Sequence, residues 1–370
     1  MIGTARQMIQ RRASCLALAI VLAAACSSGP GNSGSPAGTP VPSSSAAATA
    51  APPSASPPAP TPTTAATPKP TLTLPEPIDL LRTTATRIDA RPNPDFIVLV
   101  GGYAFVSGVG NGIGRFDGTT GGFVDSFTIP GDSCEALDAG FGAAWTATCS
   151  GPGLARIDAV TGVVTTVELG GQIPDPEASI GVGEGGVWII VGGGSPRTLL
   201  RVDPATMSVA AAYEIPGRPT AVRAGLGSVW VSDPTLDRIH RVDPDSGAIV
   251  ATIAVGAQPQ FIAVGEGALW TMDQVSGTVS RVDPATNRVV ATIQLGEQVR
   301  GGDIAAGGGS IWLRGSRTLL FRIDPATNEI VERYNPSSGS GSVAADDQAV
   351  WITAHDVTAI WRLEYSGVVE

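Results

Sequence analysis

The sequence predicts an all-β protein, specifically a seven-bladed β-propeller with four strands in each blade. Its 47 Gly and 30 Pro among 370 residues imply many turns and disfavour a helical protein. A pattern of four short strands recurs every 41 residues or so, from residue 96 to the C-terminus. Repeats of this length and content are typical of propeller blades, which close radially and so leave few exposed sheet edges.

Two anchor residues define the repeat. The first is an aromatic residue in the expected second strand: Phe105, Trp145, Trp188, Trp230, Trp270, Trp312 and Trp351, at successive spacings of 40, 43, 42, 40, 42 and 39. The second is an Arg-x-Asp motif in the third strand, starting at Arg115, Arg156, Arg201, Arg241, Arg281 and Arg322, and degraded to Arg-Leu-Glu at Arg362. Seven copies are present. Each Arg is expected to span to a neighbouring blade and bind a carboxylate or carbonyl.

The ring is expected to close through its N-terminal strand. The seventh copy ends at Glu370 without room for a fourth strand. Aligning Trp270 with Phe105 superimposes TIAVGAQPQF (252–261) on RIDARPNPDF (87–96). Residues 82–91 therefore match a fourth strand whose first three strands lie at the C-terminus, which favours a closed ring over an open solenoid.

The motif DPATN, as at Asp283, is interpreted as the hairpin between third and fourth strands. Asp can accept bonds from amides further along the turn, Pro fixes φ, and Asn tolerates a left-handed conformation. A calcium or saccharide site at each Asp is the alternative, which isolated acids support poorly.

Cys134 and Cys149 begin the first strand and end the second strand of the second copy. A turn about residues 141–142 places them opposite each other, and an exported protein can keep a disulfide. Two inert thiols or a redox site are the alternatives, but no Cys-x-x-Cys spacing or nearby His supports redox chemistry.

The N-terminus is expected to direct export. Residues 1–25 place arginines before the apolar run ALAIVLAAA, which is much shorter than the roughly 20 apolar residues of a membrane span. The sequence LAAAC resembles the bacterial lipoprotein cleavage box, with Cys26 as the lipidated residue. This implies a lipid-anchored protein of the bacterial cell envelope, on the outer side of the cytoplasmic membrane; ordinary secretion is the alternative.

Residues 26–77 are expected to form a disordered tether and residues 78–370 the propeller. The segment after Cys26 is almost entirely Ser, Ala, Thr, Pro and Gly, which cannot form a core. Removing residues 1–25 removes three of 23 basic residues and none of 33 acids, so the mature charge is 20 minus 33, or −13. This acidic balance argues against a nucleic-acid partner.

The copies IAVGEGALW, GTVSRVDPATN and RVVATIQLG make residues 97–370 resemble the YVTN-repeat propellers, a family of seven-bladed and often exported bacterial proteins. Virginiamycin B lyase-like and NHL-type propellers belong to a related superfamily. The resemblance implies a fold rather than an activity. A lyase of that kind implies paired histidines with acids, whereas this chain has only His240 and His355, in different blade positions.

A ligand site is expected at the propeller mouth, where second-strand ends and first-strand starts converge. The candidate ligand-binding residues are Asp233, Asp273, Arg314, His355 and Asp356. The same face is expected to include Arg197, Asp237, Gln274, Arg317, Asp95, Glu135, Gln260 and Asp303. This mixture of charges suits a small polar ligand, a peptide or a cation shared by carboxylates.

These patterns favour a cell-surface or periplasmic propeller that serves as a binding or protein-interaction scaffold. A lyase or hydrolase with its site at the mouth is the alternative, and a structural envelope protein is a third. The sequence shows no Ser-His-Asp spacing, nucleotide-binding Gly loop or Cys/His cluster, so we expect neither a cofactor nor a metal.

Overall fold

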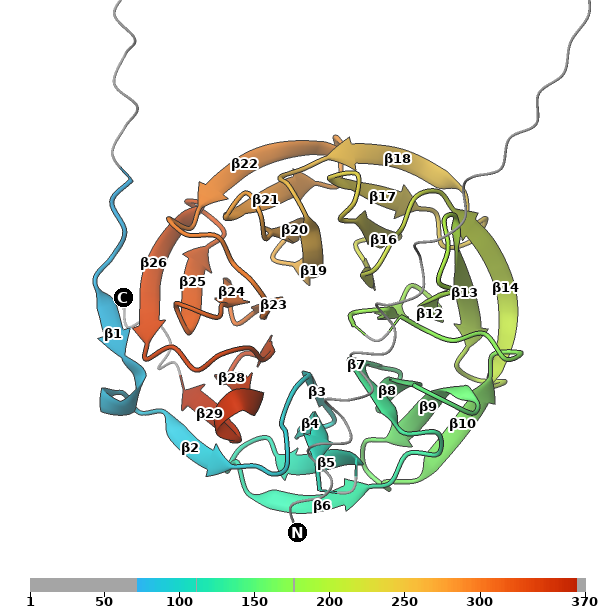
Figure 1. Ribbon diagram of the computed structural model, residues 1–370, viewed down its shortest axis with the longest axis horizontal. Helices are drawn as coiled ribbons and strands as arrows, with labels where there is room; N and C mark the ends of the chain where they lie inside the picture. The colour runs from blue at the N-terminus through green and yellow to red at the C-terminus, as the bar shows by residue number, and fades with distance from the viewer. Residues whose placement is uncertain (1–71, 111, 176, 365–370) are drawn as a thin grey trace, which may run out of the picture. The chain divides into compact units, whose positions relative to one another are not determined.

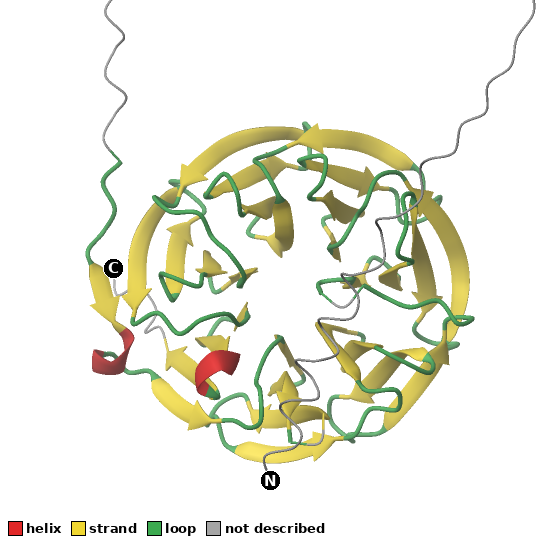
Figure 2. Cartoon of the chain, viewed as in Figure 1, coloured by secondary structure: helices red, strands yellow, loops and turns green. Residues whose placement is uncertain are grey.

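The computed structural model describes residues 72–110, 112–175 and 177–364, and it confirms the seven-bladed propeller (Figure 1). Seven sheets stand around a common centre. Each has four antiparallel strands, with the first of the blade innermost and the fourth outermost. Among the described residues, strands account for nearly all the regular structure (Figure 2), and the helical elements are two short 3-10 turns.

The strands follow chain order around the ring. Blade 1 contains β3 (Ile97–Val100), β4 (Tyr103–Val109), β5 (Gly112–Asp117) and β6 (Phe123–Phe127); blade 2, β7 (Ser133–Gly140), β8 (Ala143–Thr148), β9 (Gly153–Asp158) and β10 (Val164–Glu168); blade 3, β11 (Ile180–Gly183), β12 (Gly186–Val191), β13 (Arg197–Asp203) and β14 (Ser208–Ile215); blade 4, β15 (Val222–Gly225), β16 (Ser228–Asp233), β17 (Arg238–Val242) and β18 (Ile249–Ala254). Blade 5 contains β19 (Pro259–Gly265), β20 (Ala268–Asp273), β21 (Thr278–Asp283) and β22 (Arg288–Gln294); blade 6, β23 (Asp303–Gly307), β24 (Ser310–Arg314), β25 (Leu320–Asp324) and β26 (Glu329–Asn335); blade 7, β27 (Val343–Ala345), β28 (Ala349–Ala354), β29 (Ala359–Glu364) and the N-terminal β2 (Thr86–Asp89).

The predicted closure of the ring is confirmed. β2 pairs antiparallel with β29, with Ile88 opposite Ile360, and so supplies the fourth strand of blade 7. The Nε of Arg362 on β29 donates to the carbonyl of Gly118 in blade 1 at 2.9 Å. The last blade is thus joined to the first by both a strand and a side chain.

A fifth strand on blade 6 was not predicted. β1 (Pro77–Asp79) pairs in parallel with the outer strand β26, and the Nε of Arg333 donates to the carbonyl of Pro75 at 2.7 Å. The 3-10 turn η1 (Leu80–Arg82) follows, and its Leu80 is fully buried among residues of blades 6 and 7. The end of the expected tether therefore lies along the outer rim of the ring (Figure 1).

The predictions for residues 1–25, for Cys26 and for most of the tether (26–71) concern residues outside the described part of the chain. Within the part of the chain that the structure describes, no helix is long and apolar enough to span a membrane.

The repeated aromatic and Arg residues form the contacts between blades. All seven aromatics are fully buried. In blade 5 the Trp270 indole donates to the carbonyl of Gly265, and the Arg281 guanidinium lies 5.0 Å from the Trp270 ring centre. Arg281 also donates to the carbonyl of Pro325 in blade 6. The predicted bridging role is confirmed here, and the repeat encodes a cation–π stack that also joins neighbouring blades.

The predicted turn chemistry is also confirmed. The Asp283 carboxylate accepts the N–H of Ala285 at 3.0 Å, and Asn287 adopts φ +56°. Cys134 and Cys149 form the predicted disulfide, with their Cα atoms 4.9 Å apart.

Candidate ligand site in the central channel

The innermost strands of all seven blades line a central cavity of about 240 Å³. Many of the lining residues have apolar side chains, as at Val98, Val182, Val264 and Ala306, but polar atoms make up most of the exposed lining. Three ionisable side chains interrupt this wall: Asp138 of blade 2, Arg223 of blade 4 and Asp303 of blade 6. A cavity that combines apolar side chains with a few convergent polar groups is the usual form of a small-molecule site.

Asp138 and Arg223 occupy one repeated position, seven residues before the aromatic anchor and opposite it across the first strand pair. The seven residues there are Val98, Asp138, Gly181, Arg223, Ala263, Ala305 and Ala344. Only blades 2 and 4 have a charge at this level, and blade 3 between them has glycine.

The two charged residues bind the inner strand of blade 3 from either side. Asp138 Oδ2 accepts the N–H of Val182 at 2.7 Å, and Arg223 Nη1 donates to the carbonyl of Ile180 at 2.8 Å. These backbone groups lie on the channel-facing edge of β11, where no further strand can pair with them. A Cβ on Gly181 would lie 2.9 Å from the Cα of Arg223, so glycine is required for this close approach.

Asp303 lies at the mouth end of β23 and is 4% exposed. Its Oδ2 accepts the hydroxyl of Ser342 in blade 7 at 2.6 Å, and its Oδ1 accepts the N–H of Ile304 at 2.8 Å. The carboxylate is therefore fixed on both sides.

Burial raises the pKa of both Asp138 and Asp303, and the charge of Arg223 opposes that rise at each. Arg223 therefore acts electrostatically on both carboxylates. Among the described residues, however, no ion pair joins Arg223 to either acid, since its guanidinium binds backbone carbonyls. One cation thus partly compensates two acids within the same cavity.

Further acids gather at the mouth. The pKa of Asp95 is raised to about 7, first by burial and then by the charges of Glu135, Glu177, Asp303 and Asp356. Glu135 follows the disulfide residue Cys134 and adopts φ +73° within a bulge of β7. Over residues 72–364, with their two gaps, no three His, Cys, Asp or Glu side chains are grouped closely enough to hold a metal ion. The mouth is an acidic surface shared by several blades.

We expect Asp95→Asn to stabilise the ring at pH 8 and to leave its stability at pH 4 unchanged. The folded pKa of Asp95 lies above the unfolded value, so its contribution to stability is present below about pH 4 and is lost as pH rises to 7. The gain at pH 8 should be about 2 kcal/mol, roughly half of what the full shift would give, because the mouth is partly open to water. Urea unfolding of both proteins at pH 4 and pH 8 measures it; an equal effect at both pH values would contradict it.

The five predicted ligand-binding residues do not all meet at the mouth surface. Asp233, Asp273 and Arg314 are fully buried within their blades. Asp233 accepts the hydroxyl of Thr235 at 2.6 Å, and Arg314 donates to the carbonyl of Thr353 at 3.2 Å. These side chains support the loops of the mouth rather than line the cavity.

His355 and Asp356 do lie at the mouth, in the 3-10 turn η2 (His355–Val357). His355 Nδ1 and Asp356 Oδ1 are 2.9 Å apart, and the charge of Asp356 acts on Asp95. His240, by contrast, is buried in blade 4, where its Nδ1 is 3.1 Å from the hydroxyl of Thr252.

Sequence reasoning missed Asp138 and Arg223. The signal was available in the sequence, because among the seven copies the position seven residues before the aromatic anchor has a charged residue only in ALDAG and AVRAG. No family model matches this chain, and a search of curated proteins finds no similar sequence.

Proposed function

We propose that this chain is an extracytoplasmic binding propeller of the YVTN-repeat type, anchored to the bacterial envelope through Cys26, and that it binds a small organic cation in its channel. The observation that carries the proposal is the charge of the wall: two acids, Asp138 and Asp303, share the single cation Arg223. With both acids ionised, the wall has a net charge of −1, and the acids at the mouth extend this field outward.

The chemistry of the cavity specifies the class of ligand. Burial raises the pKa values of the two carboxylates and so favours their protonated forms. An ammonium or guanidinium group bound between them would take the place of those protons. The desolvation cost to the protein would be small, because both carboxylates are already buried. The apolar side chains of the wall, such as Val182 and Val264, would contact the hydrocarbon part of the same ligand. Polyamines, basic amino-acid derivatives and lysine side chains of peptides fit this description.

A thermal-shift experiment on the mature chain tests the binding proposal, with spermidine, lysinamide and the dianion succinate as probes. At 100 times its Kd a ligand of the folded state adds about 2.7 kcal/mol to stability. We expect spermidine or lysinamide, but not succinate, to raise the melting temperature, and we expect Asp138→Asn with Asp303→Asn to abolish the shift. A cation shift that persists in the double variant would refute the channel site.

The proposed anchor has its own test. Cells expressing the full chain are grown with radiolabelled palmitate, and we expect the wild-type protein to be labelled and Cys26→Ser to be unlabelled. Wild-type protein that is processed and exported without label would contradict the anchor and leave the channel proposal unaffected.

A further inference from the structure

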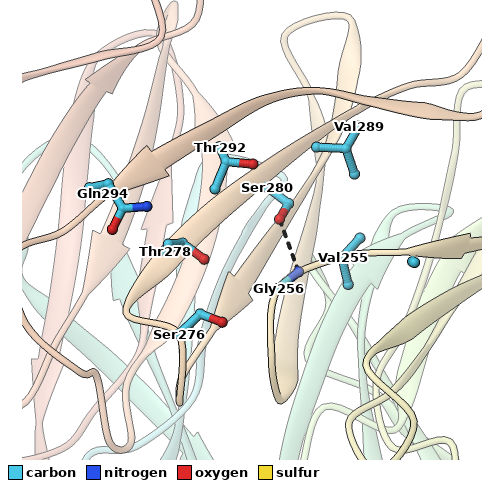
Figure 3. Close-up of a pocket in the computed structure, with 9 residues that line it drawn as sticks. Val255, Gly256, Ser276, Thr278, Ser280, Val289, Thr292 and Gln294 are labelled. Atoms are coloured by element: carbon cyan, nitrogen blue, oxygen red, sulfur yellow. Dashed lines mark hydrogen bonds between the residues drawn. The ribbon is translucent and has the colours of Figure 1, made fainter. Parts of the chain in front are cut away.

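A second cavity of about 500 Å³ lies on blade 5, away from the channel (Figure 3). One wall is the segment 254–256, which leads from the outer strand of blade 4 towards blade 5. The other walls are the loop before β21 and the strands β21 and β22. Five polar side chains line it: Ser276, Thr278, Ser280, Thr292 and Gln294.

At the base of this groove, blade 5 has a small residue where blades 3, 4, 6 and 7 have a large one. Ser280 directly precedes the repeated Arg281. At the same position blades 3, 4, 6 and 7 have buried Leu200, His240, Phe321 and Trp361, each at most 5% exposed. Blades 1 and 2 have Gly114 and Ala155 there. Among the small residues at this position, only Ser280 brings a hydroxyl group.

Buried Asp273 fixes the direction of the hydroxyl groups at the base of the groove. Ser280 Oγ and Thr278 Oγ1 donate to Asp273 Oδ2 at 2.6 and 3.0 Å. Thr271 Oγ1 donates to the other carboxylate oxygen at 2.6 Å. These protons are committed to the carboxylate, and Ser280 Oγ also accepts the N–H of Gly256 at 3.3 Å (Figure 3). The two buried side chains therefore offer a ligand only their remaining oxygen lone pairs. Asp273 thus acts through its neighbours as a positioning residue.

The rim of the groove is less constrained. Ser276 Oγ accepts the N–H of Ala257 at 2.6 Å and keeps its proton for donation. Thr292 and Gln294 are exposed and can both donate and accept. Val255 and Val289 add apolar contact surface. The lining thus combines fixed acceptors, rim groups that both donate and accept, and small apolar surfaces, and it has no charged side chain. The ligand that matches such a lining is a neutral molecule rich in hydroxyl groups.

We infer that this groove binds a neutral saccharide, independently of the channel. The hydroxyl groups of the sugar donate to Ser280 and Thr278, the rim side chains bind its outer oxygens, and its C–H surface contacts the valines. The site requires the small side chain at residue 280.

Saturation-transfer NMR on the mature chain tests this inference, with maltotriose, cellotriose and the N-acetylglucosamine trimer as probes. Ser280→Leu introduces the residue that blade 3 has at this position and should fill the groove. Thr292→Val removes an exposed hydroxyl opposite Ser280. The matched control is Thr166→Val, because Thr166 is exposed and lies opposite Ala155 at the equivalent position of blade 2.

We expect at least one trisaccharide to bind the wild type. Its affinity should fall tenfold or more in Ser280→Leu and severalfold in Thr292→Val, and stay unchanged in Thr166→Val and in the channel variant Asp303→Asn. If none of the three sugars binds, or if the affinity survives both blade 5 substitutions, the inference is wrong. If Ser280→Leu fails to fold, the comparison of sugar affinity between Thr292→Val and Thr166→Val is sufficient to test the inference. A loss of sugar affinity in Asp303→Asn would mean that the sugar binds in the channel, and it would also contradict the inference.

Discussion

A chain that begins at Arg91 is expected to lose about 5 kcal/mol of unfolding free energy relative to one that begins at Leu72. The truncation removes β2 and so leaves β29 as an unpaired edge strand. It also removes Ala90 and the fully buried Leu80, and exposes apolar surface of blade 7. Burial of such side chains contributes about 1.5–3 kcal/mol each, and the lost strand pairing adds to that.

A third chain, beginning at Thr84, separates ring closure from rim packing. It loses β1 and Leu80 but keeps β2, so we expect a smaller loss of about 2 kcal/mol. Urea unfolding monitored by tryptophan fluorescence compares the three, because all seven Trp residues are retained. Equal stabilities for the chains starting at Thr84 and Arg91 would mean that β2 does not hold the ring closed.

Replacing Arg223 by Met is expected to cost about 3 kcal/mol at pH 8. The carbonyls of Ile180 and Val222 lose their donor, and Asp138 and Asp303 lose the positive charge that stabilises their ionised forms. The folded pKa values of both acids rise further in this variant. The loss should therefore be smaller at acid pH, as the two acids take up protons, and should grow as pH rises.

A double-mutant cycle checks that explanation. We expect Asp138→Asn to recover part of the loss in the Arg223→Met background, because it removes one of the two uncompensated charges. Thermal unfolding of the single and double variants at pH 5 and pH 8 gives the coupling energy. Losses that are additive and independent of pH would show that Arg223 acts only through its backbone bonds.

Much of the fold could be predicted because propeller contacts recur with the repeat. Trp270 and Arg281 have the same partners in their blade as Trp230 and Arg241 in the blade before. The closure strand was predictable for the same reason, since the sequence around Ile88 matches an outer strand elsewhere in the chain. The strand β1 could not be predicted in this way, because it lies outside the repeat and pairs in parallel with β26 through only three residues.

The candidate site was harder to predict than the fold. The sequence repeat shows how far along its blade a residue lies, but it does not show how deeply the side chain is buried. Asp273 does follow a second strand, as predicted, yet hydroxyl groups of its own blade enclose it. Arg223 lies close to the inner strand of blade 3 because Gly181 has no side chain, and Asp138 binds the same strand from the other side. That relation involves three different blades. Such a relation becomes visible only once the ring is closed.

The most direct test of the central claim is a calorimetric titration of spermidine into the wild type, Asp303→Asn and Arg223→Met at pH 8. If the channel binds a cation between its acids, Asp303→Asn should weaken binding at least tenfold, whereas Arg223→Met should strengthen it because the competing positive charge is gone. Identical affinities in the three proteins, or a parallel loss in both variants, would contradict a cation site in the channel.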